Sequence, residues 1–163
     1  MGTFNAKILA EFQPPRKWKL GRDLTYSTKD LMGDEIKALQ DIGVKVNRDT
    51  DISPVDITVP TEFITDLAST PRILWAFIAP FDVARAAIVH DLLYKTIRQY
   101  RWNKGDIEED KLLIKKAKVV ADKVFLLAMK DAQPKVSGWK IYSAWKAVDL
   151  FGRWSIIPNE KNI

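Results

Sequence analysis

The feature of this sequence that most constrains its fold is a change in the spacing of apolar residues near residue 65. Before that point, short apolar runs alternate with turn-forming residues, a pattern typical of strands and loops. After it, apolar side chains recur every three or four positions, as in amphipathic helices. This order predicts an α+β fold, in which a small N-terminal antiparallel sheet with hairpins precedes three main helices.

Residues 1–65 are predicted to be mostly strands and loops. A half-buried strand is indicated by alternating apolar side chains at Phe4, Ala6, Ile8 and Ala10. Trp18–Leu20 and Asp23–Ser27 are predicted to pair as a hairpin across a two-residue turn. A short helix is expected around Ile36–Leu39, and short strands are expected at Asp56–Val59 and Glu62–Thr65.

Residues 66–152 are predicted to be helical. The first main helix is expected at Val83–Gln99, with the Asp82 carboxylate as its N-cap. The second is expected at Ile107–Ala132 and the third at Ser137–Phe151, with Gly152 as the residue that stops it. Residues 153–163 form a tail in this interpretation.

Composition narrows the class of protein. A chain of 163 residues without linker or repeat fits a single domain spanning residues 1–163. It has no cysteine, which excludes disulfides and thiolate metal sites. The first twelve residues lack the pattern of a signal peptide, and the most apolar run, Ile73–Pro80, is too short to span a bilayer. No transmembrane segment is expected.

The net charge of +5 comes largely from lysines on the second predicted helix. These are Lys111, Lys115, Lys116, Lys118 and Lys123. They are predicted to form a solvated helix face; a surface for nucleic acid is the alternative, but no nucleic-acid motif accompanies them. No glycine-rich phosphate loop or other cofactor motif is present, so no nucleotide or organic cofactor is expected.

The first candidate site is the corner between the last predicted strand and the helical part. Asp66, Ser69 and Arg72 follow the strand end directly, and such corners often present functional side chains. The alternative is that these residues have a purely structural role. Asp66 or Ser69 would cap the next helix, and Arg72 would pair with Asp66.

The second candidate is His90 with its neighbour Asp91, since His90 is the only histidine. It is either a buried hydrogen-bonding residue or a general base or metal ligand. A metal held by Asp66, His90 and Asp91 would be Mg or Mn, because the site is rich in carboxylates. Asp122 lies among apolar neighbours, and it either points inward to pair with His90 or Arg72 or is solvated beside lysines. The residue types would also allow a catalytic triad of Ser69, His90 and Asp66. The sequence lacks the nucleophile-elbow motif that would expose such a serine, so this alternative is disfavoured.

The last predicted helix carries an aromatic stripe at Trp139, Tyr142 and Trp145, with lysines beside it. A basic helix rich in tryptophan can lie on a membrane surface. The stripe is otherwise a packing surface, either against the rest of the chain or against a partner.

The sequence resembles a family of tailed-phage and prophage proteins of unknown function. The shared pattern is V-P-x-x-F-x-T-D-x-A-S-x-P-R, then A-A-x-x-H-D-x-L-Y, then A-D-x-x-F with A-M soon after. The matching positions are Val59-Pro60, Phe63, Thr65-Asp66, Ala68-Ser69, Pro71-Arg72, Ala86-Ala87, His90-Asp91, Leu93-Tyr94, Ala121-Asp122, Phe125 and Ala128-Met129. The resemblance implies a phage origin and synthesis in the cytoplasm of a bacterial host, and it implies no established activity.

Three functions are compatible with these observations. The favoured hypothesis is a virion or assembly accessory protein of the tail, neck or capsid, which contacts other phage structural proteins. The second is a metal-dependent hydrolase that uses Asp66, His90, Asp91 and Asp122, with a metal-activated water as nucleophile. The third is a protein that binds a host factor. The shared polar residues form either a catalytic centre or a buried network that specifies the core.

Overall fold

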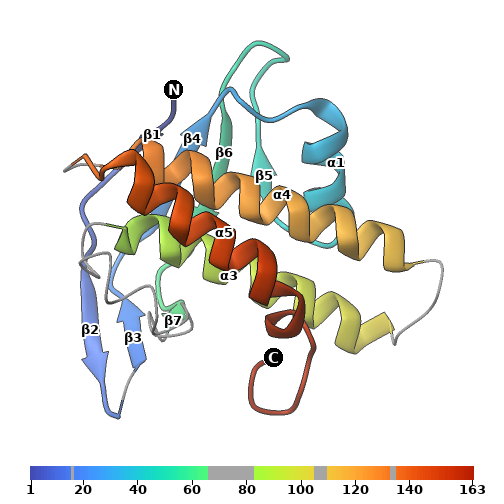
Figure 1. Ribbon diagram of the computed structural model, residues 1–163. Coiled ribbons are helices and arrows are strands. Elements are labelled where there is room, and N and C mark those ends of the chain that lie inside the picture. Colours follow the sequence, from blue (N-terminus) through green and yellow to red (C-terminus); the bar gives the residue numbers. More distant parts are fainter. Residues whose placement is uncertain (16, 66–82, 105–109, 133–134) are drawn as a thin grey trace.

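The computed structural model describes the whole chain except residues 16, 66–82, 105–109 and 133–134 (Figure 1). Its N-terminal part holds β1 (Thr3–Phe4), β2 (Ala10–Gln13), β3 (Lys17–Leu20), β4 (Leu24–Thr28), α1 (Gly33–Asp41), β5 (Val46–Asn47), β6 (Val55–Val59) and β7 (Ile64–Thr65). Its C-terminal part holds α3 (Ala84–Lys104), α4 (Lys111–Lys130) and α5 (Gly138–Ser155). This arrangement confirms the predicted α+β class.

The main sheet has four antiparallel strands in the order β1-β4-β6-β5. Its two central strands alternate strictly between buried and partly exposed residues, as expected for a sheet with one covered face. The covered side chains are Leu24, Tyr26, Thr28, Val55, Ile57 and Val59. Helix α3 packs against β4 and β6, so the first main helix lies directly on this sheet.

A smaller sheet has the order β2-β3-β7, and it shows that the predicted hairpin between Trp18–Leu20 and Asp23–Ser27 is wrong. Strand β3 pairs with β2 and β7, whereas β4 pairs with β1 and β6. The reason lies at Leu20, whose backbone N–H donates to Phe63 O and whose carbonyl accepts from Glu62 N. With both groups occupied, the chain crosses to the other sheet instead of reversing.

The half-buried strand predicted from Phe4 to Ala10 is not a continuous strand, although its alternating burial is present, and the predicted short helix is confirmed. Side chains at even positions from Phe4 to Ala10 are half-buried and those between them are exposed, although β-ladders form only at the two ends of this stretch. The short helix expected around Ile36–Leu39 is α1, which buries Ile36, Ala38 and Leu39. Helix α1 contacts α4 and β5.

The three main helices pack as a group, with α4 in contact with both α3 and α5. In Figure 1, α5 lies in front of α3 and alongside α4. The predicted first helix is confirmed but extends to Lys104, while its proposed cap, Asp82, lies outside the described residues. Among the residues that the structure describes, no helix combines the length and apolarity needed to cross a membrane.

The expectation that Gly152 stops the last helix is wrong, because α5 continues to Ser155. Gly152 is a buried position of α5 against which the Tyr94 side chain of α3 packs. A Cβ atom there would overlap the Tyr94 hydroxyl and would lie 3.1 Å from Tyr94 Cζ and 3.2 Å from Lys118 Cε. The absence of a side chain therefore allows this contact.

Replacing Gly152 with alanine is expected to destabilise the fold by about 1–3 kcal/mol, because the added methyl group overpacks a rigid site. The measurement is urea unfolding followed by circular dichroism. Gly138→Ala is the matched control, since a Cβ at Gly138, in the first turn of the same helix, meets no atom within 4 Å. Equal stability of the two variants would contradict the close-approach role of Gly152.

Candidate functional site

The centre of the helical part is the carboxylate of Asp122, which is only 3% exposed on α4. Its Oδ1 accepts a hydrogen bond from the Tyr94 hydroxyl at 2.7 Å and from His90 Nε2 at 3.2 Å. Its Oδ2 accepts from Lys118 Nζ at 2.7 Å. Both oxygens of this buried carboxylate are therefore occupied by donors from α3 and α4.

The network extends to the third helix through Lys118. The Lys118 ammonium also donates to the Asp149 carbonyl at 3.0 Å and lies 3.8 Å from Asp149 Oδ1. Lys118 itself is only 8% exposed. One buried ammonium and one buried carboxylate thus connect α3, α4 and α5, and each charge has a partner of opposite sign.

Burial and hydrogen bonding shift the pKa of the Asp122 carboxyl in opposite directions. Burial alone would raise the pKa of this carboxyl, because it disfavours the charged form. The hydrogen bonds from His90, Lys118 and Tyr94 outweigh burial and lower the pKa below its ordinary value of 3.8. Tyr94 shows the opposite change, since burial and the neighbouring Asp122 charge both raise the pKa of its phenol. The carboxylate is therefore charged and the phenol is a neutral donor near pH 7.

Aromatic rings enclose the imidazole of His90. Its ring centroid lies 4.0 Å from that of Tyr94 and 4.8 Å from that of Phe125. The neighbouring Asp91 is only partly buried and accepts a hydrogen bond from the Thr65 hydroxyl, which ties α3 to β7. His90 and Asp91 thus use their polar atoms on different partners, although they are adjacent in sequence.

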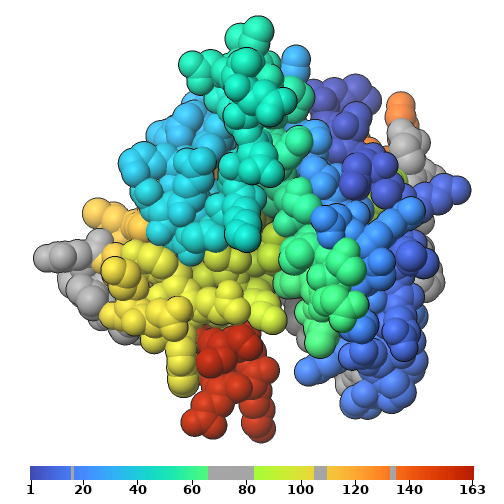
Figure 2. Space-filling model, turned by 180° about the vertical axis from the view of Figure 1, so that it is seen from behind, coloured from blue at the N-terminus to red at the C-terminus, as the bar shows by residue number. Residues whose placement is uncertain are grey.

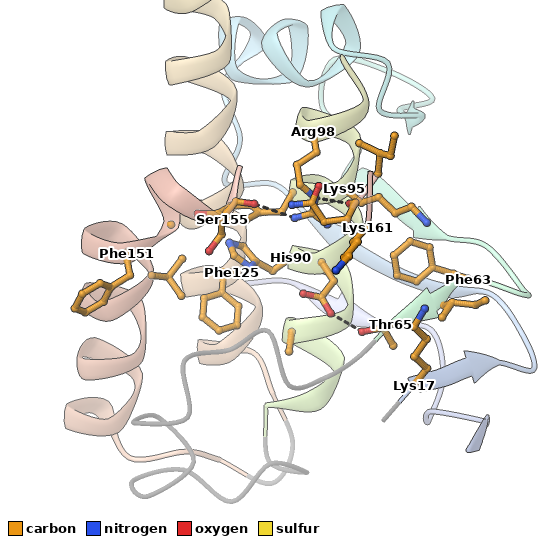
Figure 3. Close-up of a pocket in the computed structure, with 18 residues that line it drawn as sticks. Lys17, Phe63, Thr65, His90, Lys95, Arg98, Phe125, Phe151, Ser155 and Lys161 are labelled. Carbon is orange, nitrogen blue, oxygen red and sulfur yellow. Dashed lines mark hydrogen bonds between the residues drawn. The ribbon is translucent and has the colours of Figure 1, made fainter. Parts of the chain in front are cut away.

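A pocket of about 420 Å³ opens beside this network, between α3, α5 and the β3–β7 edge (Figure 3). His90, Asp91 and Tyr94 contribute to its wall. The remaining lining residues are Lys17, Phe63, Ile64, Thr65, Ala87, Lys95, Arg98, Phe125, Val148, Phe151, Gly152, Ser155, Lys161, Asn162 and Ile163. The His-Asp pair predicted from sequence therefore borders a pocket large enough for a small molecule.

The structure resolves some of the alternatives drawn from the sequence. Asp122 points inward and pairs with His90, as one hypothesis held, but it pairs with a lysine as well. The predicted corner of Asp66, Ser69 and Arg72 lies outside the described residues. In the described part of the chain, no three acidic or histidine side chains are grouped closely enough to hold a metal ion.

The predicted solvated face of lysines is wrong at Lys118, which is buried in the network. Its spacing of four from Asp122 on one helix was the signal that sequence reasoning missed. Lys116 and Lys123 form ion pairs with Asp34 and Glu35 of α1, at 2.8 and 2.7 Å. Lys17, Lys95 and Arg98 were not singled out, because nothing in their local sequence places them around one pocket.

The aromatic stripe on α5 divides between two environments. Trp145 is partly buried against the core, whereas Trp139 is 59% exposed and Tyr142 is 61% exposed. Further along, α5 leaves Leu150, Phe151 and Trp154 about half-exposed, and Phe151 also borders the pocket. The buried side of the helix is a narrow stripe of Ile141, Ala144, Val148 and Gly152. Trp139 and Tyr142 therefore keep more than half of their surface exposed.

The fold and the network thus define an α+β protein with a closed polar centre beside an open pocket. Residues 41–148 match the family model described as protein of unknown function (DUF1353), and the chain belongs to this family. The matched region contains α3, α4 and most of α5, including His90, Asp91 and Asp122. No curated protein matches the chain, and no solved structure does.

Replacing Asp122 with asparagine is expected to destabilise the protein by about 3 kcal/mol near pH 7, because the Lys118 ammonium loses its buried counter-charge. The folded-state pKa of Asp122 is lowered, so its contribution is fully present above the ordinary pKa of 3.8 and is lost as the pH falls below that value. The difference between wild type and variant should therefore shrink on acidification.

Urea unfolding of both proteins between pH 7 and pH 3 measures this difference. Asp51→Asn, at an exposed loop position, is the control and should change stability by less than about 0.5 kcal/mol. If the difference in unfolding free energy between wild type and Asp122→Asn stays constant with pH, the charge of Asp122 does not stabilise the folded state.

Proposed function

We propose that this protein is a phage-encoded accessory protein of virion assembly, which acts through protein–protein contacts made by the outer face of α5. The observation that supports the proposal most directly is the exposure of Trp139, Tyr142 and Trp154 on one helix, at 59%, 61% and 55%. Large aromatic residues are enriched in protein interfaces and among the residues that dominate binding energy.

The charges on this face fit a protein partner. Lys146 and Arg153 lie beside Trp145 and Trp154, with cation–ring distances of 5.8 and 4.4 Å. Aromatic rings flanked by basic side chains give a contact surface with a desolvated centre and a polar rim. A partner with an apolar patch bordered by carboxylates would complement it.

The polar centre supports a structural interpretation of the shared residues. Both oxygens of Asp122 accept hydrogen bonds, and Nε2 of His90 is committed to one of them. Three buried donors therefore already surround this carboxylate, which supports a role for the network in holding the helices together. The resemblance to tailed-phage proteins supports phage origin, synthesis in the host cytoplasm and contacts with other phage structural proteins.

Mass spectrometry of purified phage particles and assembly intermediates tests this role. The chain is expected in one or both, and its absence from both would contradict the proposal. A Tyr142→Ala/Trp154→Ala double variant should reduce its incorporation at least about tenfold, since interface aromatics often contribute more than 1 kcal/mol each.

Trp102→Ala is the matched control for that experiment, because Trp102 is 49% exposed but lies on α3. It should leave incorporation unchanged. If the protein is missing from particles and instead captures a host protein through the same aromatic face, the host-binding hypothesis replaces the assembly role.

A metal-dependent hydrolase is the second candidate, and the observation that favours it is the position of His90 and Asp91 on the wall of the pocket. In this case Asp122 would orient the imidazole, and the metal would be Mg or Mn held by Asp66, His90 and Asp91. Metal analysis of the purified protein, followed by activity and stability measurements on His90→Ala, distinguishes the two. A stability loss without bound metal or activity would reject the hydrolase.

A further inference from the structure

We propose that the pocket between α3, α5 and the β3–β7 edge binds a small organic anion, a carboxylate or phosphate carried on a flat apolar body. Four cationic side chains and a single acidic one belong to its described lining, namely Lys17, Lys95, Arg98 and Lys161 against Asp91. A concave site with an excess of one charge concentrates the field and attracts ligands of opposite sign. This inference is independent of the assembly role.

The cations reach the pocket from three separate parts of the chain. In Figure 3, Lys17 comes from β3, Lys95 and Arg98 come from α3, and Lys161 comes from the C-terminal segment. Convergence from distant segments is a tertiary arrangement and not the ordinary spacing of a solvated helix face. The acidic member, Asp91, already accepts a hydrogen bond from Thr65.

The cations differ in what they already bind. Arg98 donates from Nε to the Asn162 carbonyl at 2.7 Å and from Nη1 to the Ser155 carbonyl at 3.1 Å, so it holds the C-terminal segment as a wall. Figure 2 shows this segment projecting beyond α3, apart from the β7 region. Within the described residues, the Lys17 and Lys161 ammonium groups have neither a hydrogen bond nor an ion pair.

Lys95 is the cation most directly combined with an apolar surface. Its ammonium lies 5.6 Å from the centroid of the Phe63 ring, and within the described residues it has no acidic partner. Phe63, Phe125 and Val148 give the pocket apolar walls, and a volume of about 420 Å³ falls within the usual range of small-ligand sites. An anion would meet Lys17 and Lys95 while its apolar body lies against Phe63.

Isothermal titration of the intact chain with phenyl phosphate, inorganic phosphate and benzyl alcohol tests the proposal. Phenyl phosphate should bind saturably at one site per chain. Inorganic phosphate and benzyl alcohol should each bind at least about fivefold more weakly, because the first lacks the apolar ring and the second lacks the negative charge. Raising the salt concentration should weaken the binding of phenyl phosphate.

Lys95→Gln and Lys17→Gln should each weaken phenyl phosphate binding about fivefold or more. Lys140→Gln is the matched control, because Lys140 is also partly buried and lies 5.9 Å from an aromatic centroid, that of Trp139, but outside the pocket. Thermal unfolding of each variant checks that the fold is retained. The proposal would be overturned if phenyl phosphate showed no saturable binding, or if benzyl alcohol bound as tightly as phenyl phosphate. It would also be overturned if Lys140→Gln lost as much affinity for phenyl phosphate as Lys95→Gln and Lys17→Gln.

Discussion

The arrangement of the helices depends on one buried charge, the carboxylate of Asp122. An ionised carboxylate in an apolar core is tolerated only when it is paired and its oxygens accept hydrogen bonds. Here the donors are Tyr94 and His90 on α3 and Lys118 on α4, and Lys118 also contacts Asp149 on α5. Because hydrogen bonds require short distances and defined angles, this set restricts the three helices to one relative placement, which apolar packing alone would leave less specific.

The same placement produces the pocket. Tyr94 meets Asp122 only because α5 presents Gly152 where any side chain would overlap the phenol. On α3, His90 and Tyr94 belong both to the network and to the pocket wall, where Asp91, Lys95 and Arg98 join them. The polar centre and the pocket therefore share a wall formed by α3. A change in the network should alter the pocket wall as well, whereas a change in Lys95 should leave the network intact.

The sequence predicted the α+β class, the short helix and the main helices, because each is specified by local apolar spacing. It offered the pairing of Asp122 with His90 or Arg72 as one of two alternatives, the other being a solvated Asp122, and only the structure selected His90. The hairpin at Gly21 was wrong because local turn signals do not reveal that Leu20 uses both backbone groups on residues 62 and 63. Lys118 was misplaced because a lysine normally keeps its charge in water.

By itself, the sequence determined the order of strands and helices and the few polar residues that must find partners inside the core. The spacing of apolar residues in helices and strands involves only residues close together in the chain, so it can be recognised from the sequence. Only the tertiary structure decided which partners were found, that the Tyr94 side chain packs against Gly152 of α5, and that lysines from β3, α3 and the C-terminal segment surround one pocket. Those features are contacts between distant segments, and their energies exist only once the helices have packed.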